Sequence, residues 1–425
     1  MGTLEIEEFS AKEIFTATVI VAALGYFVDV YDLLLFLIIG KQSLVDLGVG
    51  TSILDKEVNN LFGELLRIQM YGMLVGGIIW GVMGDIKGRL TVLFGSILIY
   101  SLANLANGFV HLSPEHSISF YKILRFIAGF GLAGELGVGV TLVAEQMSKS
   151  NRGYGTMVVA AIGVLGAIFA AVFANFVDWK ICYIFGGVLG FGLLATRISV
   201  KESEIFAHSK ASKVARGNFF YLFMSRDRLV RYLQCIIIGL PVWFIVGILA
   251  EKAHLFSTFF GISTPIIPSV SVALCYAGLT LGDIASGFLS QKLKSRKKVM
   301  YWFYPAGILF TLMYLYLEVS NYYGFLALLF CLGFSAGFWA VFVIVACEQF
   351  GTNIRATAAT TVPNFVRGSF ALVSILFIYL SDGNTLDLEH QRHASVVIMF
   401  LIYGLSFVAA ITMKETFGKE LDYNE

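Results

Sequence analysis

Twelve long apolar runs, separated by short polar connections, constrain this chain more than any other feature of its sequence. A helix that crosses roughly 30 Å of bilayer hydrocarbon needs about 20 mostly apolar residues at about 1.5 Å per residue. Each run is long enough for this. We therefore predict an all-α polytopic membrane protein with twelve transmembrane helices, whose runs begin near Ile14, Leu61, Thr91, Ile118, Tyr154, Ile181, Tyr232, Val270, Val299, Tyr322, Ala358 and Ala394.

The composition agrees with this prediction and excludes several classes of protein. The chain is 57% hydrophobic and 14% charged, and its mean hydropathy is +0.79, so most of it cannot be the surface of a soluble domain. A formal net charge of +1 leaves no polybasic surface for a nucleic-acid partner. No G-x-x-x-x-G-K-S/T loop is present, which excludes ATP-driven transport by this chain alone.

The sequence also gives no pattern for a metal, a cofactor or an enzyme active site. The six histidines fall in predicted connections, and no Ser/His/Asp or Cys/His set lies at a plausible depth. We therefore expect no cofactor, no metal and no enzyme activity. The five cysteines fall in apolar runs without ligand-like spacing and are interpreted as packing residues: Cys182, Cys235, Cys275, Cys331 and Cys347.

Basic residues concentrate in alternate connections, which sets the orientation. By the positive-inside rule these connections are cytoplasmic, and both termini lie on the same side. The first thirteen residues are acidic and lack the basic region of a signal peptide. Because no N-x-S/T sequon occurs, we expect a bacterial cytoplasmic (inner) membrane. The clusters are Lys87 and Arg89, Lys149 and Arg152, Lys201 to Arg231, Lys292 to Lys298, and Arg355.

One long polar connection divides the chain into two halves. We predict a six-helix bundle over residues 1–198, a cytoplasmic linker over 199–231 and a second six-helix bundle over 232–425. The linker is either a solvated connection or a regulatory or lipid-binding segment. Arg152 follows Glu145 by seven residues, and Arg355 follows Glu348 by the same distance, since 152−145 = 355−348. Parallel six-helix repeats with a site between them are typical of transporters.

Several motifs resemble those of the major facilitator superfamily, and together they extend over nearly the whole chain. The segment from Gly81 to Arg89 matches G-x-x-x-D-R/K-x-G-R, except that Ile86 replaces the cation. The series Arg125-x-x-x-Gly129-x-Gly131 matches the fourth-span signature. Within the superfamily, the marks Glu202-Ser203 and Glu415-Thr416-Phe417-Gly418 are similar to those of the metabolite–proton symporter and sugar porter branches.

The resemblance implies two six-helix bundles that alternate in access, and an inner gate of charged residues at the cytoplasmic ends of the spans. Topology and helix capping are the alternative explanation for these charges. The gate residues that it implies are Gly81, Asp85, Gly88, Arg89, Glu145, Arg152, Glu348 and Arg355.

Ionisable residues inside the spans are the candidates for proton coupling, because such residues are costly in a bilayer. Asp29 and Asp32 are three residues apart and so share one helix face. Arg125 of the fourth span lies at about the depth of Asp32, so we predict an ion pair whose separation changes the proton affinity of the acid. Alternatively, Asp32 only balances Arg125, and Asp29 makes a local hydrogen bond.

Candidate substrate residues lie deeper in the spans. Arg367 is suited to bind an anionic group through two hydrogen bonds, or else it pairs with a buried acid such as Asp283. Glu135 holds a second proton or a cationic substrate group, or else contacts a polar neighbour. The aromatic candidates form cavity walls or only pack. The full set is Arg367, Glu135, Asn364, Asp283, Tyr31, Trp243 and Trp339.

We therefore expect a secondary active transporter that carries a small polar metabolite, such as an organic acid, amino acid or zwitterion, together with protons. Its partners are the substrate, protons and the lipid bilayer, and we expect a monomer. Two alternatives remain open at this point. One is a proton-independent facilitator of a sugar or organic solute, and the other is a nutrient sensor that does not transport.

Overall fold

The computed structural model describes residues 14–53, 55–112, 115–198, 200–211, 214–264, 266–383 and 387–425. The acidic first thirteen residues and Lys213 of the linker, both used in the topology prediction, lie outside these ranges. Twelve helical segments of the described chain are long and apolar enough to cross a membrane. This confirms the predicted all-helical class and the number of spans.

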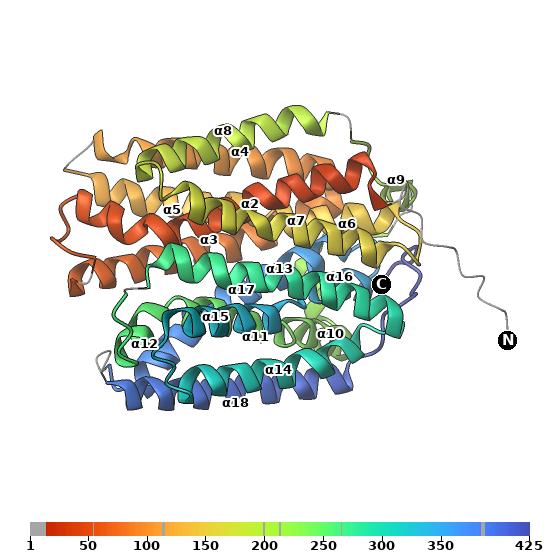
Figure 1. Cartoon of the computed structure of the whole chain (residues 1–425). Coiled ribbons are helices and arrows are strands. Elements are labelled where there is room, and N and C mark those ends of the chain that lie inside the picture. The colour runs from red at the N-terminus through yellow and green to blue at the C-terminus, as the bar shows by residue number, and fades with distance from the viewer. Residues whose placement is uncertain are drawn as a thin grey trace.

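The first six spans lie together in the upper part of Figure 1. They are α2 (Ala17–Asp46), α3 (Lys56–Lys87), α4 (Arg89–Gly108), the pair α5 (Ser117–Leu132) and α6 (Glu135–Gln146), α7 (Arg152–Phe173) and α8 (Trp179–Arg197). A short turn, η1 (Val110–Leu112), follows α4, and the helix α9 (Glu204–Ala211) follows α8.

The last six spans lie in the lower part of the same view. The first of them combines α10 (Arg226–Ile237), α11 (Leu240–Phe244) and the π-helical turn η3 (Ile245–Ala250). It is preceded by η2 (Phe219–Phe223) and followed by α12 (Ala253–Phe259). The others are α13 (Pro268–Leu293), α14 (Lys297–Tyr316), the pair α15 (Tyr322–Ala336) and α16 (Trp339–Gln349), α17 (Arg355–Leu380) and α18 (Leu388–Thr412).

Two span boundaries differ from those that hydropathy predicts. A span of about 25 residues that begins near Ile14 would end near Ile39. The first helix instead continues to Asp46, where its polar residues have partners: the Ser43 hydroxyl lies 2.9 Å from that of Tyr121. Asp32 is therefore closer to the middle of its helix than predicted. The seventh span begins at Arg226 rather than near Tyr232, inside the predicted linker.

The fourth and tenth spans are each interrupted at the same place in the repeat. The first interruption is at Ala133–Gly134 and the second at Gly337–Phe338, and 337−133 = 338−134 = 204, within one residue of the offset of 203 between the two glutamate–arginine motifs. Asn364 of α17 donates a hydrogen bond to the exposed carbonyl of Ala133 at 2.8 Å. Interrupted helices inside a membrane are tolerated where their free backbone groups are bonded by neighbouring protein.

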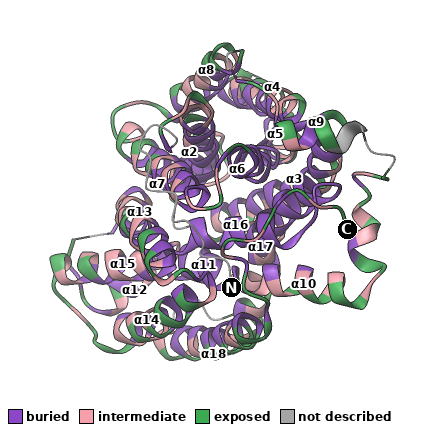
Figure 2. Cartoon of the chain, turned by 90° about the vertical axis from the view of Figure 1, so that its right-hand side faces the viewer, coloured by how far each residue is buried: buried purple, intermediate pink, exposed green. Residues whose placement is uncertain are grey.

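Figure 2 views the molecule along its helices, from the end that holds the C-terminus. Buried residues fill the centre of the assembly, and exposed residues face outward on α4, α8, α14 and α18. Apolar side chains that face outward on these helices, such as Leu102, Val188 and Leu401, are those that lipid would cover. The functional centre must therefore be sought where the two sets of six spans meet.

Glycines allow the helices to approach one another closely. A Cβ atom added at Gly333 of α15 would overlap the backbone oxygen of Cys275 on α13. At Gly81 it would come within 2.9 Å of the Cα of Thr357, where α3 meets α17. Such small-residue contacts are the usual means of packing helices in lipid.

Replacing Gly333 by alanine is expected to lower the free energy of unfolding by about 1–3 kcal/mol, because the backbone of α13 cannot yield without repacking. Gly404 of α18 is the matched control, since no atom lies within 4 Å of its added Cβ. The same substitution there is expected to stabilise by roughly 0.5–1 kcal/mol through helix propensity. Melting temperatures of the two purified variants should shift in opposite directions, and a common shift would contradict this packing.

Candidate functional site

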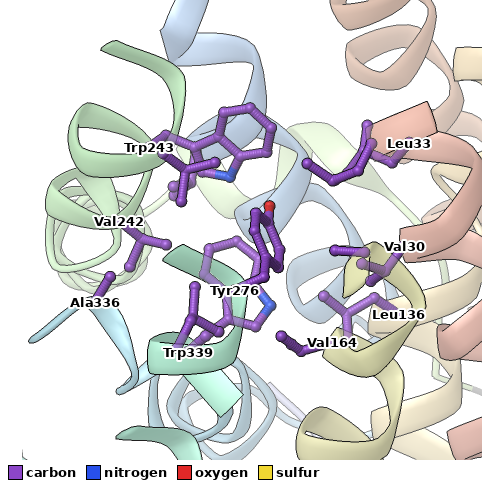
Figure 3. Packing of buried hydrophobic residues seen from close by; sticks show 14 of the residues in the cluster. Val30, Leu33, Leu136, Val164, Val242, Trp243, Tyr276, Ala336 and Trp339 are labelled. Atoms are coloured by element: carbon purple, nitrogen blue, oxygen red, sulfur yellow. The ribbon is translucent and has the colours of Figure 1, made fainter. Parts of the chain in front are cut away.

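A small cavity lies between the two sets of spans. Its volume is about 20 Å³, which is of the order needed for a single water molecule. Figure 3 shows Trp243, Tyr276 and Trp339 of the later helices opposite Val30 and Leu33 of α2. In the described chain the cavity is lined by Tyr26, Val30, Leu33, Leu34, Val164, Val242, Trp243, Tyr276, Leu279, Trp339 and Arg367.

Arg367 is the charged residue of this lining and is almost fully buried, at 2% exposure. Its Nη2 donates to Oδ2 of Asp29 at 3.3 Å, so the pair joins α17 to α2. Its guanidinium also lies 5.8 Å from the centre of the Trp339 ring. The alternative role predicted for Arg367 is a pair with a buried acid such as Asp283, but the acid that the structure places there is Asp29.

Asp283 has a different partner. One of its carboxylate oxygens accepts the backbone N–H of Ala340 at 2.9 Å, in the first turn of α16. It therefore caps the half-helix that follows the interruption of the tenth span, where a carboxylate is favoured by the helix dipole. The indole Nε1 of Trp339, in the same turn, is buried beside the Tyr26 hydroxyl and makes no hydrogen bond of ordinary geometry among the described residues.

The predicted ion pair between Arg125 and Asp32 is not formed. Arg125 is fully buried and donates to Gln69 at 3.4 Å and to Asn104 at 3.3 Å. No oxygen of Asp32 lies within the 4.0 Å of an ion pair, and neither accepts a hydrogen bond of ordinary geometry in the described chain. The amide of Asn104 lies beside both side chains.

Three aromatic rings contribute to holding the guanidinium of Arg125. The ring centres of Tyr183, Phe36 and Tyr121 lie 5.0, 5.2 and 5.8 Å from it. Cation–π contacts of this kind strengthen when water is excluded. Arg125 is thus stabilised by amides and rings, so that Asp32 remains available without being neutralised by direct contact.

Glu135 also lies away from the cavity. Its carboxylate accepts from Arg197 of α8 at 2.5 Å and from the hydroxyl of Ser96 on α4 at 2.7 Å. The absence of a side chain at Gly25 leaves room for this pair against α2, because an added Cβ would overlap the Arg197 guanidinium. Of the alternatives left open by the sequence, contact with polar neighbours is the one observed.

Tyr31, Asn364 and Trp243 complete the predicted substrate set. The hydroxyl of Tyr31 donates to the carbonyl of Cys182 at 2.9 Å, so this side chain faces α8 rather than the cavity. Asn364 bonds Ala133 and Thr360, both at 2.8 Å, and fixes the interruption of the fourth span. Only Trp243, Trp339 and Arg367 of the predicted set line the cavity.

A network of buried charges closes one end of the assembly, which we call the basic end because the clustered cations and the C-terminus lie there. Glu145 accepts from Arg89 at 2.8 and 3.2 Å within its own set of spans. It also accepts from Arg355 of α17 at 2.8 Å. A second acid, Asp85, accepts the backbone N–H groups of Ala356 and Thr357 at 3.0 and 2.8 Å, at the start of α17.

The repeat produces a related network around Glu348. Arg296 donates to it at 3.0 and 3.2 Å from the same set of spans, while Arg152 of the other set lies 3.9 Å away. Gly88 lies between α3 and α4 with φ of 108°, a conformation that favours glycine. Gly81 lets α17 approach α3.

Contacts also join the two sets of spans at the opposite end. Lys41 of α2 lies 3.6 Å from Glu251, which precedes α12. The hydroxyl of Ser269 lies 3.3 Å from the amide oxygen of Asn175. With both ends in contact and a cavity of about 20 Å³ between them, the structure has an occluded centre.

A comparison with protein families identifies the family to which the chain belongs. The model of the family described as the Major Facilitator Superfamily matches residues 22–369. The chain belongs to the Major Facilitator Superfamily. It is accordingly an integral membrane protein and a secondary transporter, and its family is one of transporters rather than enzymes.

Individual members of the superfamily are similar over most of their length. The putative niacin/nicotinamide transporter NiaP of Bacillus subtilis is 25% identical over 374 residues, which are 84% of this chain and 86% of that protein. A putative metabolite transport protein of Haemophilus influenzae is 25% identical over 434 residues, or 94% and 96%.

A solved structure of the proton:xylose symporter XylE has a TM-score of 0.75 and covers 97% of this chain and 98% of that one. At 16% identity this likeness shows the fold alone.

Sequence reasoning missed several residues of these networks. Arg197, Arg296 and Tyr276 each lie at a helix end or in an apolar run without a motif around them. The repeat offers a signal for Arg296, because 296−89 = 207 is close to the offset of 203 between the two glutamate–arginine motifs of this chain. No such signal exists for Arg197 or for the amides around Arg125, because only the packing of helices brings these side chains together.

Replacing Asp85 by asparagine is expected to open the basic end more often. The three hydrogen bonds from Ala356 and Thr357 are made to a charged acceptor, and such bonds contribute about 1.5–3 kcal/mol each. Cys347 is the probe, because it is fully buried between Ala144, Ala359 and Leu421 at this junction. With the other cysteines changed to alanine, its labelling by maleimide should accelerate by roughly tenfold or more.

The control for this labelling experiment is Asp382→Asn, because that side chain is 80% exposed and pairs only with His390 among the described residues. An unchanged rate at Cys347 in the Asp85 variant would contradict a gating role.

Proposed function

We propose that this transporter is a proton-coupled symporter of a small, flat organic carboxylate. The observation that carries the proposal is the position of Arg367, a buried cation in the wall of a small, mostly apolar cavity between the two sets of spans. A guanidinium can bind a carboxylate through two parallel hydrogen bonds. The one ion pair of Arg367 in the described chain is a single bond to Asp29 at 3.3 Å, so further N–H donors of the guanidinium are free for an anionic substrate group.

The remaining walls of the cavity favour a flat and largely apolar molecule. Trp243, Trp339 and Tyr276 offer ring faces, and the other side is aliphatic apart from Tyr26. The Nε1 of Trp339, which makes no hydrogen bond of ordinary geometry in the described chain, is a donor for a second acceptor on the substrate. A sugar would bury several hydroxyl groups, each costing about 2–7 kcal/mol without a partner. The lining in the described chain has no amide and no second charged residue to bond them.

The relatives support the same class of substrate. One of them is named as a putative niacin/nicotinamide transporter, and niacin is an aromatic ring with a single carboxylate. Its printed name concerns that protein, but the chemistry fits a cavity with one cation and three aromatic walls. We therefore choose nicotinate and benzoate as the first probes for this chain.

Asp32 is the proposed site of the coupled proton. It is 1% exposed, and its oxygens have no hydrogen-bond partner of ordinary geometry among the described residues. A charged carboxylate in such a place costs several kcal/mol, whereas a protonated one does not. Arg125 also lies beside Asn104, so a movement of α5 relative to α2 changes the field at Asp32 and with it the stability of the bound proton.

Alternating access follows from the contacts at the two ends. We propose that residues 1–198 and 232–425 act as two bundles joined by a linker over 199–231. Opening toward the cytoplasm requires the Arg355–Glu145 pair to separate. Opening outward requires the contacts of Lys41 and Ser269 to separate. We further propose a monomer in a bacterial cytoplasmic membrane, with the basic end inside.

Arg367→Ala is expected to abolish the binding of nicotinate and benzoate, because the cation that pairs with the carboxylate is removed. Arg367→Lys keeps the charge but loses the two-bond geometry, so it should bind roughly tenfold more weakly than wild type. Isothermal titration calorimetry at pH 6 measures both. If the alanine variant bound these probes with wild-type affinity, Arg367 would not belong to the substrate site. Substrate uptake that does not depend on pH would favour a proton-independent facilitator.

Asp32→Asn is expected to abolish uphill uptake that is driven by a proton gradient while it spares exchange of substrate across the membrane. Exchange needs no net proton movement, whereas accumulation does. Proteoliposomes with an imposed pH gradient and a radiolabelled carboxylate separate the two activities. Full accumulation by the variant would exclude Asp32 as the coupling site, and a protein that binds without any transport would be a sensor.

A further inference from the structure

We propose that Asp29 competes with the substrate for Arg367: it occupies the guanidinium in the empty transporter, is displaced by the substrate carboxylate, and takes up a proton when it is released. The inference rests on the proposed function, because it assumes that Arg367 binds the substrate. It adds a second acid whose protonation depends directly on whether the cavity is occupied.

The contact between Asp29 and Arg367 is the kind that a ligand can replace. A single oxygen of Asp29 accepts from Arg367, at 3.3 Å, while its other oxygen has no partner in the described chain. Glu145 and Glu348, by contrast, each receive two bonds from one arginine, with shortest distances of 2.8 and 3.0 Å. An incoming carboxylate that makes two parallel bonds therefore has the better geometry.

The position of the pair favours the same exchange. Arg367 is part of the cavity wall, but Asp29 is not, although it is fully buried behind that wall on α2. A ligand in the cavity thus reaches the guanidinium from one side while Asp29 holds it from the other. Movement of Arg367 toward the ligand is enough to lengthen a bond that is already 3.3 Å.

Among the residues that the structure describes, no other cation pairs with Asp29. On its own helix its electrostatic neighbours are Asp32 and Tyr26, and from other helices they are Glu135 of α6, Tyr100 of α4 and Tyr276 of α13. Arg197 of α8 is already bonded to Glu135 and to the Leu93 carbonyl. Arg152 of α7 lies at the basic end with Glu348.

A released Asp29 would therefore be a buried negative charge among acids and phenols, which is unfavourable by several kcal/mol. Proton uptake removes this charge. The balance is simple: one substrate anion enters, one proton from solution binds the Asp29 carboxylate, and the net charge of the cavity region is unchanged. No covalent bond other than the O–H bond is made or broken.

The exchange also affects the junction between the two sets of spans. Within the described chain, the other ion pairs that cross this junction lie at its ends: Lys41–Glu251, Arg355–Glu145, Arg152–Glu348 and Lys149–Glu420. Asp29–Arg367 is the pair at its centre. Substrate binding would replace this direct link between α2 and α17 by a link through the ligand.

The test is the affinity of Asp29→Asn for nicotinate and benzoate, measured by titration calorimetry between pH 5.5 and 8. Removing an internal competitor should strengthen binding at pH 7.5 by roughly five- to tenfold. In wild type, affinity should fall as the pH rises, because the ionised Asp29 holds Arg367 more firmly. In the variant this dependence should flatten, and the protons taken up per ligand should fall by about one.

Two further variants separate this role from a structural one. Asp29→Glu keeps an ionisable competitor and should restore the pH dependence. Asp283→Asn, another buried acid whose partner is a backbone N–H rather than an arginine, should not strengthen binding. The buffer-dependence of the binding enthalpy gives the proton count for each variant.

The outcomes are distinct. A folded Asp29→Asn protein that binds these probes no more tightly than wild type, with the same proton count, would overturn the inference while leaving the proposed function intact. If neither wild type nor variant binds any flat carboxylate, the proposed function fails and the inference fails with it. Binding by the variant alone would support a competitor strong enough to mask the wild-type site.

Discussion

The cost of burying charge in a chain that lies mostly in lipid governs this structure. Arginines and acids deep inside the spans are each held by a particular set of groups: Arg125 by amides and aromatic rings, Arg197 by Glu135, and Arg367 by Asp29. These interactions differ in strength. The difference separates charges that hold helices together from charges that can change partner. Bonds made in pairs at short distance fix helices, whereas the single bond of Asp29 and the unbonded carboxylate of Asp32 leave room for exchange.

The two halves of the repeat use related charges unequally. Glu145 bonds strongly to cations from both sets of spans, while Glu348 bonds strongly only to Arg296 of its own set and lies 3.9 Å from Arg152 of the other. The interruptions of the fourth and tenth spans are also bonded by different groups, a side-chain amide in one and a carboxylate in the other. The two networks therefore occupy related positions, but the one around Glu145 makes the closer contact between the two sets of spans.

Predictions from the sequence succeeded where one helix or one motif carries the signal. Twelve spans, the charge-rich basic end and membership of the superfamily all follow from hydropathy, basic clusters and local motifs. The prediction of an Arg125–Asp32 ion pair was wrong because equal depth says nothing about which face of each helix is turned toward the other. The amide of Asn104, which lies beside the two side chains, comes from a third helix that the depth argument did not consider.

The sequence by itself determined that this chain spans a membrane twelve times, that its halves are related, and which charges are buried. Those properties depend on the free energy of transferring residues into lipid, which is local and nearly additive along the chain. Only the tertiary structure decided the partners: Asp29 rather than Asp283 for Arg367, Arg197 for Glu135, and a small aromatic cavity beside them. Partner choice depends on the rotation and packing of whole helices. Asp29 and Arg367, for example, are 338 residues apart in the chain. Such side chains meet only when glycine contacts set the rotations of their helices.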